Sequence, residues 1–464
     1  MIPIYDMLQE YIKKEPTMFH MPGHKMGSKV SHYYNDIIKW DVTEIPETDN
    51  LHNPNGAILE AQKMAAYAFG ADYTFFLVNG STCGIHAAIM SVCKKGDKII
   101  VGRDCHKSVL NILTYLEAKV CFVNPEYNDE FGILGGYSLE NIQKAVDKNT
   151  DSVAVLITSP NYYGICSDIE KIANIVHQSN KILIVDEAHG AHLNFCDRLP
   201  KSAVTSGADL VVQSAHKTLP ALTQTAYLHL NGDRVSKRKL QRILSTIQTS
   251  SPSFVLMASL DIARHIMQSE GQSRLNDILD VIDQFKISNG KIKILSDKYI
   301  KHGYMDKTRL VINFKEANLV GYDVERILME RYNIRVEMAD LYNIVCIVTV
   351  CDDKINLDRL KDALEDLLNN TVKQEVPKFA ILDSQCECIT LKDVKDEESI
   401  LVDLKDSVGK ISYNMIVPYP PGIPYIISGQ EIKSCHVLYL NNLISKNAII
   451  NGISDDGKIE VLKK

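Results

Sequence analysis

The sequence predicts an α/β fold, in which a large domain built on a mostly parallel sheet is followed by smaller α+β units. The first observation is the length, because 464 residues are too many for a single hydrophobic core. The second is that short apolar runs alternate with helical patterns between about residues 58 and 217, which is typical of a parallel sheet covered on both faces. The third is that polar residues directly follow several apolar runs, which places them at the carboxyl ends of strands.

The individual elements follow from the spacing of apolar residues. In the large domain, strands are expected at 73–78, 98–101, 120–123, 153–157, 182–185 and 208–212. Helices are expected at 58–69, 85–93 and 169–178, with one more ending at Leu116 and two later helices at 254–267 and 273–288. The small α+β unit should contain strands at 310–314, 334–339 and 344–350 and helices at 324–332 and 357–368.

Domain boundaries are expected where this pattern changes. We predict an N-terminal helix and loop segment over residues 1–30, a large domain over 31–295, a small α+β domain over 296–370 and a C-terminal domain over 378–464. The N-terminal helix has one apolar face, so it should dock on its own subunit or on a partner.

Composition excludes several classes of function. Hydrophobic residues make up 45% and charged residues 23%, as in ordinary soluble proteins, and the net charge is −7. Nucleic acid and anionic membrane are therefore not expected as partners. The chain shows neither a signal-peptide pattern nor an apolar run of membrane-spanning length, so we predict a cytoplasmic protein. The 11 cysteines contain no C-x-x-C pair and are expected to be reduced thiols rather than disulfides or zinc ligands.

Lys217 and Asp186 carry the chemistry that the sequence predicts. Lys217 follows the expected strand at 208–212, and Asp186 directly follows the strand at 182–185. A lysine and an aspartate at one sheet edge are what a pyridoxal phosphate (PLP) site needs, since the lysine forms a Schiff base and the carboxylate pairs with the pyridinium nitrogen. A loop lysine pointing into water is the simpler interpretation of Lys217 alone.

Other strand ends add to this interpretation. Ser81 lies in a small polar turn between a strand and a helix, a layout that holds phosphate on free backbone N–H groups, and His106 follows the strand at 98–101. His189 and His192 could be drawn with Asp186 as a metal cluster, but an imidazole near a strand end is more often hydrogen-bonded scaffold, so no metal is expected.

Six stretches then resemble a known family, the Orn/Lys/Arg decarboxylases of PLP fold type I (aspartate aminotransferase-like). The chain looks most like the short bacterial members that lack the N-terminal wing domain. The matching stretches are Phe19–Lys25, Asp104–Ser108, Asp186–His192, Ser214–Lys217, Thr249–Ser253 and Pro418–Pro424. They span nearly the whole chain in family order, so the resemblance is highly specific.

The resemblance implies roles for individual residues. Lys217 would carry the internal aldimine, Asp186 would keep the ring nitrogen protonated, and His106 would stack on the ring; these three are the expected catalytic residues. The expected cofactor-binding residues are Ser81, Thr82, His106, Asp186, Ala188, His189, Ser214, His216, Lys217, Thr249 and Ser250. Among them, Ala188 would lie against the other ring face and Ser81, Thr82, Ser214 and His216 would bind the phosphate. Thr249 or Ser250 would reach the phosphate of a neighbouring subunit, because the family builds its sites at a dimer interface.

The resemblance implies decarboxylation of a basic L-amino acid to its amine and CO2, in polyamine-related metabolism, by a homodimer or higher homo-oligomer. Arginine is favoured over lysine and ornithine, because the short members are commonly assigned to it. The alternatives are another PLP reaction (an aminotransferase, lyase or cyclase) and a non-catalytic regulatory homologue.

The residue that binds the distal cation of the substrate is open. In the family a Pro-Gly-Glu segment usually follows a Pro-rich loop, which in this chain is Val417–Pro424. Here the segment after that loop reads Ser428-Gly429-Gln430-Glu431. Glu44, Glu47 and Asp49, which lie in the irregular acidic segment Glu44–Gly56, are the other candidates for holding the substrate's cation.

Overall fold

The computed structural model describes residues 1–27, 34–288, 290–370, 388–391, 394, 397–419, 422–446 and 448–463. Residues 371–377, which separate the predicted small and C-terminal domains, lie outside this part of the chain, as do Pro420 and Pro421. The chain forms two compact units, one of Met1–Val92 with Ile182–Asn276 and the other of Cys93–Lys181 with Asp277–Lys464. Each unit is described by itself below.

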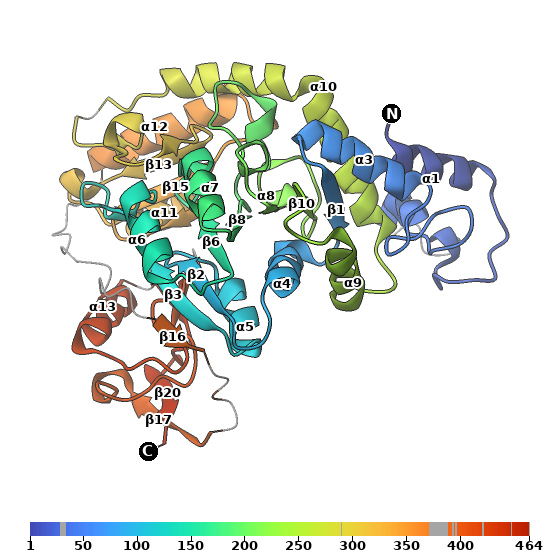
Figure 1. The fold of residues 1–464 in the computed structure, drawn as a ribbon. Coiled ribbons are helices and arrows are strands. Elements are labelled where there is room, and N and C mark those ends of the chain that lie inside the picture. Colours follow the sequence, from blue (N-terminus) through green and yellow to red (C-terminus); the bar gives the residue numbers. More distant parts are fainter. Residues whose placement is uncertain are drawn as a thin grey trace. The chain divides into compact units, whose positions relative to one another are not determined.

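The sheet of the first unit contains four strands in the order β1-β10-β9-β8 (Figure 1). They are β1 (Tyr73–Leu77), β8 (Ile182–Asp186), β9 (Leu210–Gln213) and β10 (Ala226–Leu230). β8 and β9 are parallel, whereas β10 runs antiparallel to β9 and to β1. The strands at 73–78, 182–185 and 208–212 were predicted and β10 was not, although all of its residues are buried.

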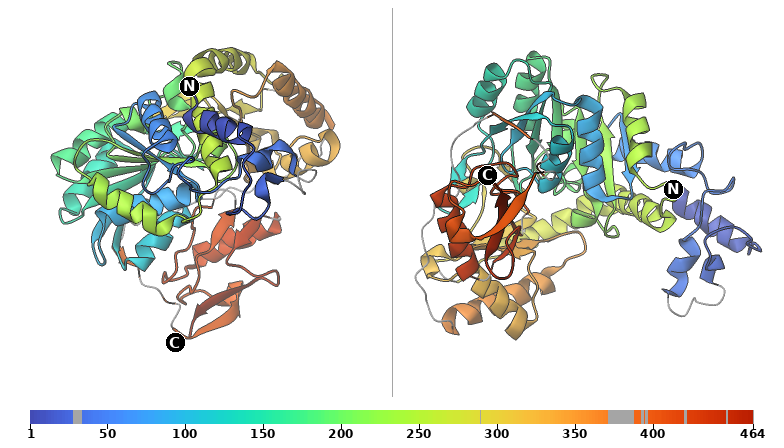
Figure 2. Two further views of the ribbon diagram at one scale, coloured as in Figure 1. Left: turned by 90° about the vertical axis from the view of Figure 1, so that its right-hand side faces the viewer. Right: turned by 90° about the horizontal axis from the view of Figure 1, so that it is seen from below.

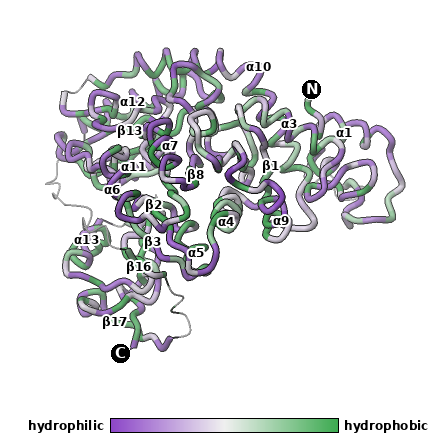
Figure 3. The backbone as a smooth tube through the Cα atoms, in the orientation of Figure 1, coloured by the Kyte–Doolittle hydropathy of each residue, from purple (hydrophilic) through white to green (hydrophobic). Residues whose placement is uncertain are grey.

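Besides the N-terminal helix, this unit contains α3 (Ala57–Phe69), α4 (Gly80–Val92), α8 (Ala215–Thr218), α9 (Lys237–Ile247) and α10 (Phe254–Gln284). The last of these continues into the second unit. The prediction of two helices at 254–267 and 273–288 was wrong, because α10 is one continuous helix of 31 residues. Gly271 lies inside it, where an added Cβ would come within 3.2 Å of Phe195 and Met267. This glycine therefore permits close packing and does not end the helix. In Figure 3 the tube of α10 alternates between purple and green, so polar and apolar residues are interspersed along its length.

The N-terminal helix α1 (Pro3–Lys13) docks on its own chain, which was one of the two predicted possibilities. The backbone N–H of Ile4 donates to Asp261 Oδ2 at 2.9 Å, and the Arg264 guanidinium donates to the carbonyl of Met1 at 3.1 Å. Asp261 and Arg264 form an ion pair whose side chains are both fully buried. A buried charge pair on α10 thus holds the start of the chain.

The second unit contains the parallel strands β2 (Lys98–Gly102), β3 (Lys119–Val123) and β6 (Ala154–Thr158), in the order β6-β2-β3. β16 (Cys388–Thr390) pairs antiparallel with β3 at the edge. The helices α5 (Lys107–Tyr115), α6 (Leu139–Lys148) and α7 (Ile169–Gln178) belong to the same unit. The three parallel strands lie where the sequence predicted strands.

A small α+β region follows in the second unit. Its antiparallel sheet has the order β11-β13-β15-β14, built from β11 (Lys293–Ile294), β13 (Arg309–Asn313), β15 (Asn343–Ile347) and β14 (Met338–Ala339). α11 (Gly321–Tyr332) and α12 (Lys354–Asn370) share an apolar core with it. The predicted strand at 334–339 is reduced to the two residues of β14.

The C-terminal segment has its own apolar core, which includes Ile416, Leu440 and Val461. It contains β17 (Ser399–Asp403), β18 (Val417–Tyr419), α13 (Ser434–Ser445), β19 (Ile449–Asn451) and β20 (Lys458–Leu462). β17 pairs with β20, and β18 pairs with β19. Both views in Figure 2 show this segment, in red, as one group of a helix and short strands.

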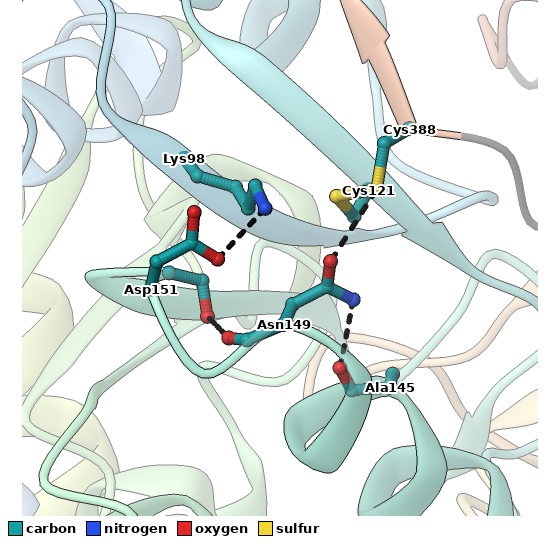
Figure 4. The surroundings of a disulfide bond; sticks show 7 residues. Lys98, Cys121, Ala145, Asn149, Asp151 and Cys388 are labelled. Carbon is teal, nitrogen blue, oxygen red and sulfur yellow. Dashed lines mark hydrogen bonds and ion pairs between the residues drawn. A yellow bond between two sulfur atoms is a disulfide. The ribbon is translucent and has the colours of Figure 1, made fainter.

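A disulfide joins Cys121 on β3 to Cys388 on β16, across 267 residues of sequence (Figure 4). The expectation of reduced thiols was therefore wrong for these two cysteines. Antiparallel pairing of β16 with β3 places the two residues directly opposite each other, with 4.1 Å between their Cα atoms. This pairing over a long sequence distance could not be predicted from cysteine spacing.

Candidate active site

Lys217 lies in the short helix α8, which follows the carboxyl end of β9. Its side chain is partly buried, and its Nζ lies 3.1 Å from His189 Nε2. His189 comes three residues after the end of the neighbouring parallel strand β8. Parallel strands end at one edge of a sheet, so the fold itself brings the lysine and the histidine together.

Asp186 is the last residue of β8 and is 4% exposed. Burial raises the pKa of its carboxyl group, while the positive charge of Lys217 and a 3.1 Å hydrogen bond from the Ala188 N–H lower it. The structure therefore brings Asp186, Ala188, His189 and Lys217 into one group. A desolvated carboxylate in such a group stabilises a nearby cation more strongly than it would in water.

A phosphate-sized anion has suitable donors in the same unit. α4 begins at Gly80, whose φ of +75° allows the tight turn after β1, and Ser81 and Thr82 lie in the first turn of this helix. The first backbone N–H groups of a helix have no partner within it and favour an anion. α4 packs against β9 and β10.

Ser214 and His216 flank the start of α8. The Ser214 hydroxyl is buried and has no hydrogen-bond partner among the described residues. His216 Nδ1 lies 3.0 Å from the carbonyl oxygen of Thr225, which fixes the orientation of the ring. A buried hydroxyl without a partner is costly, and a phosphate oxygen would satisfy it.

Thr249 and Ser250 lie between α9 and α10. The Thr249 N–H donates to Asn79 Oδ1 at 3.3 Å, and the Thr249 carbonyl lies 2.8 Å from His52 Nε2. The backbone of Thr249 is thus attached to the turn that precedes α4 in its own chain. Contact with a neighbouring subunit stays a prediction.

The three acidic candidates for the substrate's cation differ in their surroundings. Asp49 accepts hydrogen bonds from the backbone N–H groups of residues 50, 55, 56 and 58 and so closes the N-terminus of α3. Glu44 accepts from the Leu51 N–H at 3.2 Å. Glu47 is exposed, and no hydrogen bond to its side chain is present among the described residues. Asp49 is therefore used by the fold, and Glu47 is the most available of the three.

Glu187, which the sequence interpretation missed, is buried directly after Asp186. Its Oε1 accepts from the Ala203 N–H at 2.7 Å, and its Oε2 accepts from Ser202 Oγ and Gln213 Nε2, both at 2.6 Å. Burial raises the pKa of Glu187 to about 7, against the effect of these hydrogen bonds. An acidic residue directly after a strand-terminal aspartate was the available signal.

The hydrogen-bond chain continues beyond Gln213. Gln213 Oε1 lies 3.0 Å from His229 Nε2, and His229 Nδ1 lies 2.8 Å from Thr74 Oγ1. Burial lowers the pKa of His229 to about 3, so this imidazole is neutral. This series of side-chain hydrogen bonds connects β8, β9, β10 and β1. It supports the sheet edge that carries Asp186 and Lys217.

His106 belongs to the second unit, where it caps the N-terminus of α5. Its Nδ1 accepts from the Ser108 N–H at 3.2 Å. Gly422 lies against its ring, because a Cβ added to Gly422 would be 3.3 Å from His106 Cδ2. The Lys107 N–H also donates to the Gly422 carbonyl at 3.2 Å. The sequence did not indicate this contact between residues more than 300 positions apart.

Neither a metal-ligating cluster nor a membrane-spanning helix is present in the part of the chain that the structure describes. No group of three or more histidine, cysteine, aspartate or glutamate side chains could hold a metal ion there. No helix within those residues is both long and apolar enough to cross a bilayer.

The residues present fit PLP. The partnerless Ser214 hydroxyl and the N-terminus of α4 suit a phosphate group, while buried Asp186 and the lysine amine of Lys217 suit a pyridinium ring and an aldehyde.

Comparison with known proteins identifies the family. Residues 2–301 match the profile of the Orn/Lys/Arg decarboxylase major domain, and residues 367–456 match that of the C-terminal domain of the same family. The chain belongs to the Orn/Lys/Arg decarboxylase family. This membership makes it a PLP-dependent amino-acid decarboxylase and confirms the resemblance found in the motifs.

Individual relatives agree with this family. An arginine decarboxylase of Bacillus subtilis is 35% identical over 475 residues, which cover 98% of this chain and 96% of the relative. The solved structure of the Francisella novicida lysine decarboxylase LdcF aligns with a TM-score of 0.84 at 21% identity, covering 100% of this chain and 81% of the other. An alanine–glyoxylate aminotransferase from Nostoc aligns with a TM-score of 0.54 at 17% identity over 67% of this chain and 86% of its own. These likenesses confirm the predicted type I fold.

Proposed function

We propose that this protein decarboxylates L-arginine to the corresponding amine and CO2. The group of Asp186, His189 and Lys217 supports the decarboxylase chemistry. The observation that carries the choice of arginine is the nearly full-length match, at 35% identity, to the arginine decarboxylase of Bacillus subtilis. A link to polyamine metabolism follows from the nature of this amine product.

PLP, when bound, would act as the electron sink for the carbanion that remains at Cα after CO2 departs. The Asp186 carboxylate would stabilise positive charge on the ring nitrogen, because it is desolvated and close to Lys217. Lys217 Nζ would hold a proton and return it to Cα, with His189 Nε2 at 3.1 Å to orient the amine.

The other residues would position the cofactor and the substrate. Ser81, Thr82, Ser214 and His216 would hold the phosphate, with Ala188 on one ring face and His106, as the family resemblance implies, on the other. The exposed carboxylate of Glu47 is our candidate for the distal cation of the substrate.

We also propose a homodimer in which Thr249 or Ser250 of one subunit reaches the phosphate of the other. The predicted domain division at residues 31–295, 296–370 and 378–464 stays a proposal. The family matches over residues 2–301 and 367–456 support it.

A screen of arginine, lysine and ornithine for amine product by mass spectrometry tests the proposal. We expect agmatine from arginine and its loss in Lys217→Ala, while Lys144→Ala, which removes an exposed lysine on α6, keeps full activity. Formation of a keto acid instead of CO2 would favour the alternative of an aminotransferase. No turnover of any basic amino acid, and no lysine labelled by borohydride, would refute both enzyme proposals.

A further inference from the structure

A second site is suggested by a cavity of about 120 Å³ in the second unit. Its walls come from the connection between β14 and β15, from α11, from α13 and from the Pro-rich loop. At about 10–15 Å³ for each water-sized group, this volume holds a ligand of roughly ten non-hydrogen atoms. Its lining includes one carboxylate and five tyrosines, namely Asp340, Tyr163, Tyr322, Tyr342, Tyr425 and Tyr439.

Asp340 supplies a fixed carboxylate to this cavity. Its Oδ1 accepts from the N–H groups of Tyr342 and Asn343 at 2.8 and 2.9 Å, and its Oδ2 accepts from the Tyr163 hydroxyl at 2.9 Å. Each of these donors is neutral, and Asp340 forms no ion pair with any lysine, arginine or histidine that the structure describes. Burial raises the pKa of Asp340, while the hydrogen bonds from Asn343, Tyr342 and Tyr163 lower it.

The tyrosine rings make the rest of the wall suitable for a cation. The rings of Tyr425 and Tyr439 lie 4.5 Å apart at an angle of 42°. Burial, followed by the negative charge of Asp340, raises the pKa of Tyr163 and of Tyr322, so these hydroxyls stay neutral. Neutral aromatic faces attract an organic cation, and such an interaction strengthens when the cation is desolvated.

From this arrangement we propose that the cavity binds a small organic cation, an alkylammonium or alkylguanidinium ion with a short apolar stem. The carboxylate and the ring faces would stabilise the charged head. Ile133, Leu341 and Leu443 would cover the stem. An anion in this cavity would be repelled by the Asp340 carboxylate, because the lining contains no lysine or arginine to offset its negative charge.

Residues of the Pro-rich loop line this cavity and also lie next to His106. Pro418, Ile423 and Pro424 line it, and Gly422 of the same loop lies against His106. The Arg103 guanidinium donates to the carbonyls of Pro424 and Tyr425 at 2.7 and 2.9 Å, which ties the loop to the residues before α5. A bound cation would restrain this loop and so change turnover. This consequence rests on the proposed function, whereas the binding itself does not.

Titration calorimetry of the holoenzyme with n-butylguanidinium tests the binding. We expect one saturable site per chain in this cavity, weakened at least tenfold in Asp340→Asn, which corresponds to about 1.4 kcal/mol. Asp366→Asn is the matched control, because Asp366 also accepts from a tyrosine hydroxyl, that of Tyr332, but lies outside this cavity. Its affinity should equal that of the wild type. Butylurea, a neutral analogue of similar shape, should bind at least tenfold more weakly.

Three results would overturn the proposal: no saturable binding, equal binding of butylurea, or unchanged affinity in a folded Asp340→Asn protein. If Asp340→Asn fails to fold by circular dichroism, Tyr439→Leu decides, since it removes one ring and leaves the hydrogen bonds of Asp340 in place. Unchanged affinity in Tyr439→Leu would then place the bound cation elsewhere. Because binding is measured without turnover, an inactive enzyme would refute the proposed function and leave this result unaffected.

Discussion

The most informative prediction concerns Glu187, a buried carboxyl group at the end of β8. Burial raises its pKa from 4.5 to about 7. Between these values the folded chain holds a proton that the unfolded chain has lost. The contribution of Glu187 to stability is therefore complete below about pH 4.5 and is lost as the pH rises through about 7. A difference of about 2.5 pH units corresponds to about 3 kcal/mol.

Replacing Glu187 by glutamine removes this titration. The substitution also alters the hydrogen bonds from Ser202 and Gln213, but that cost is largely independent of pH. Relative to the wild type, we therefore expect the variant to gain about 3 kcal/mol of unfolding free energy between about pH 4.5 and about pH 8.

Urea unfolding, followed by circular dichroism on both proteins in parallel, measures this difference. Glu140→Gln serves as the control, because the Glu140 carboxylate is exposed on α6 and pairs with Lys144. Its stability difference from the wild type should stay nearly constant over the same range, because an exposed ion pair is screened by solvent. A difference for Glu187→Gln that stays constant with pH would refute the assignment of a raised pKa and the reasoning from burial.

Three further predictions concern stability and the disulfide. Asp261→Ala should lower the free energy of unfolding by about 3–5 kcal/mol, because it leaves the fully buried Arg264 without a counter-charge. In urea unfolding, the apolar double variant Asp261→Leu with Arg264→Met should recover most of this loss. A double variant as unstable as the single one would contradict the prediction. Phe69→Ala should lower the free energy of unfolding by about 3–5 kcal/mol in the same assay, since the ring is fully buried. A loss below about 1 kcal/mol would show that the surrounding side chains close up and leave no cavity. Alkylation without reductant, read by peptide mass spectrometry, should leave Cys121 and Cys388 unlabelled, and labelling of both would exclude the disulfide.

Much of the fold was predictable because apolar periodicity is a local property. The strands that became β1, β2, β3, β6, β8 and β9 could be recognised from apolar runs, since a buried strand needs apolar side chains along its length. β10 was missed, although it is equally buried, because its sequence Ala-Tyr-Leu-His-Leu carries a histidine. That histidine, His229, is accommodated through hydrogen bonds to Gln213 and Thr74, partners that are distant in sequence.

The sequence by itself determined the family and the chemistry available to it. Motifs that contain Asp186, Lys217 and His106 are short continuous stretches. Their residue types predicted a PLP site, and their resemblance to the family predicted a decarboxylase. The family was confirmed by the profile matches over residues 2–301 and 367–456.

Only the tertiary structure decided which groups have a partner and which do not. It assigned Asp49 to the N-terminus of α3, left the Ser214 hydroxyl without a described partner, and joined Cys121 to Cys388. It also surrounded Asp340 with tyrosines from three separate parts of the second unit. Hydrogen bonding, desolvation and ring contacts depend on distances between residues that are remote in the chain, and no local pattern of residues encodes those distances.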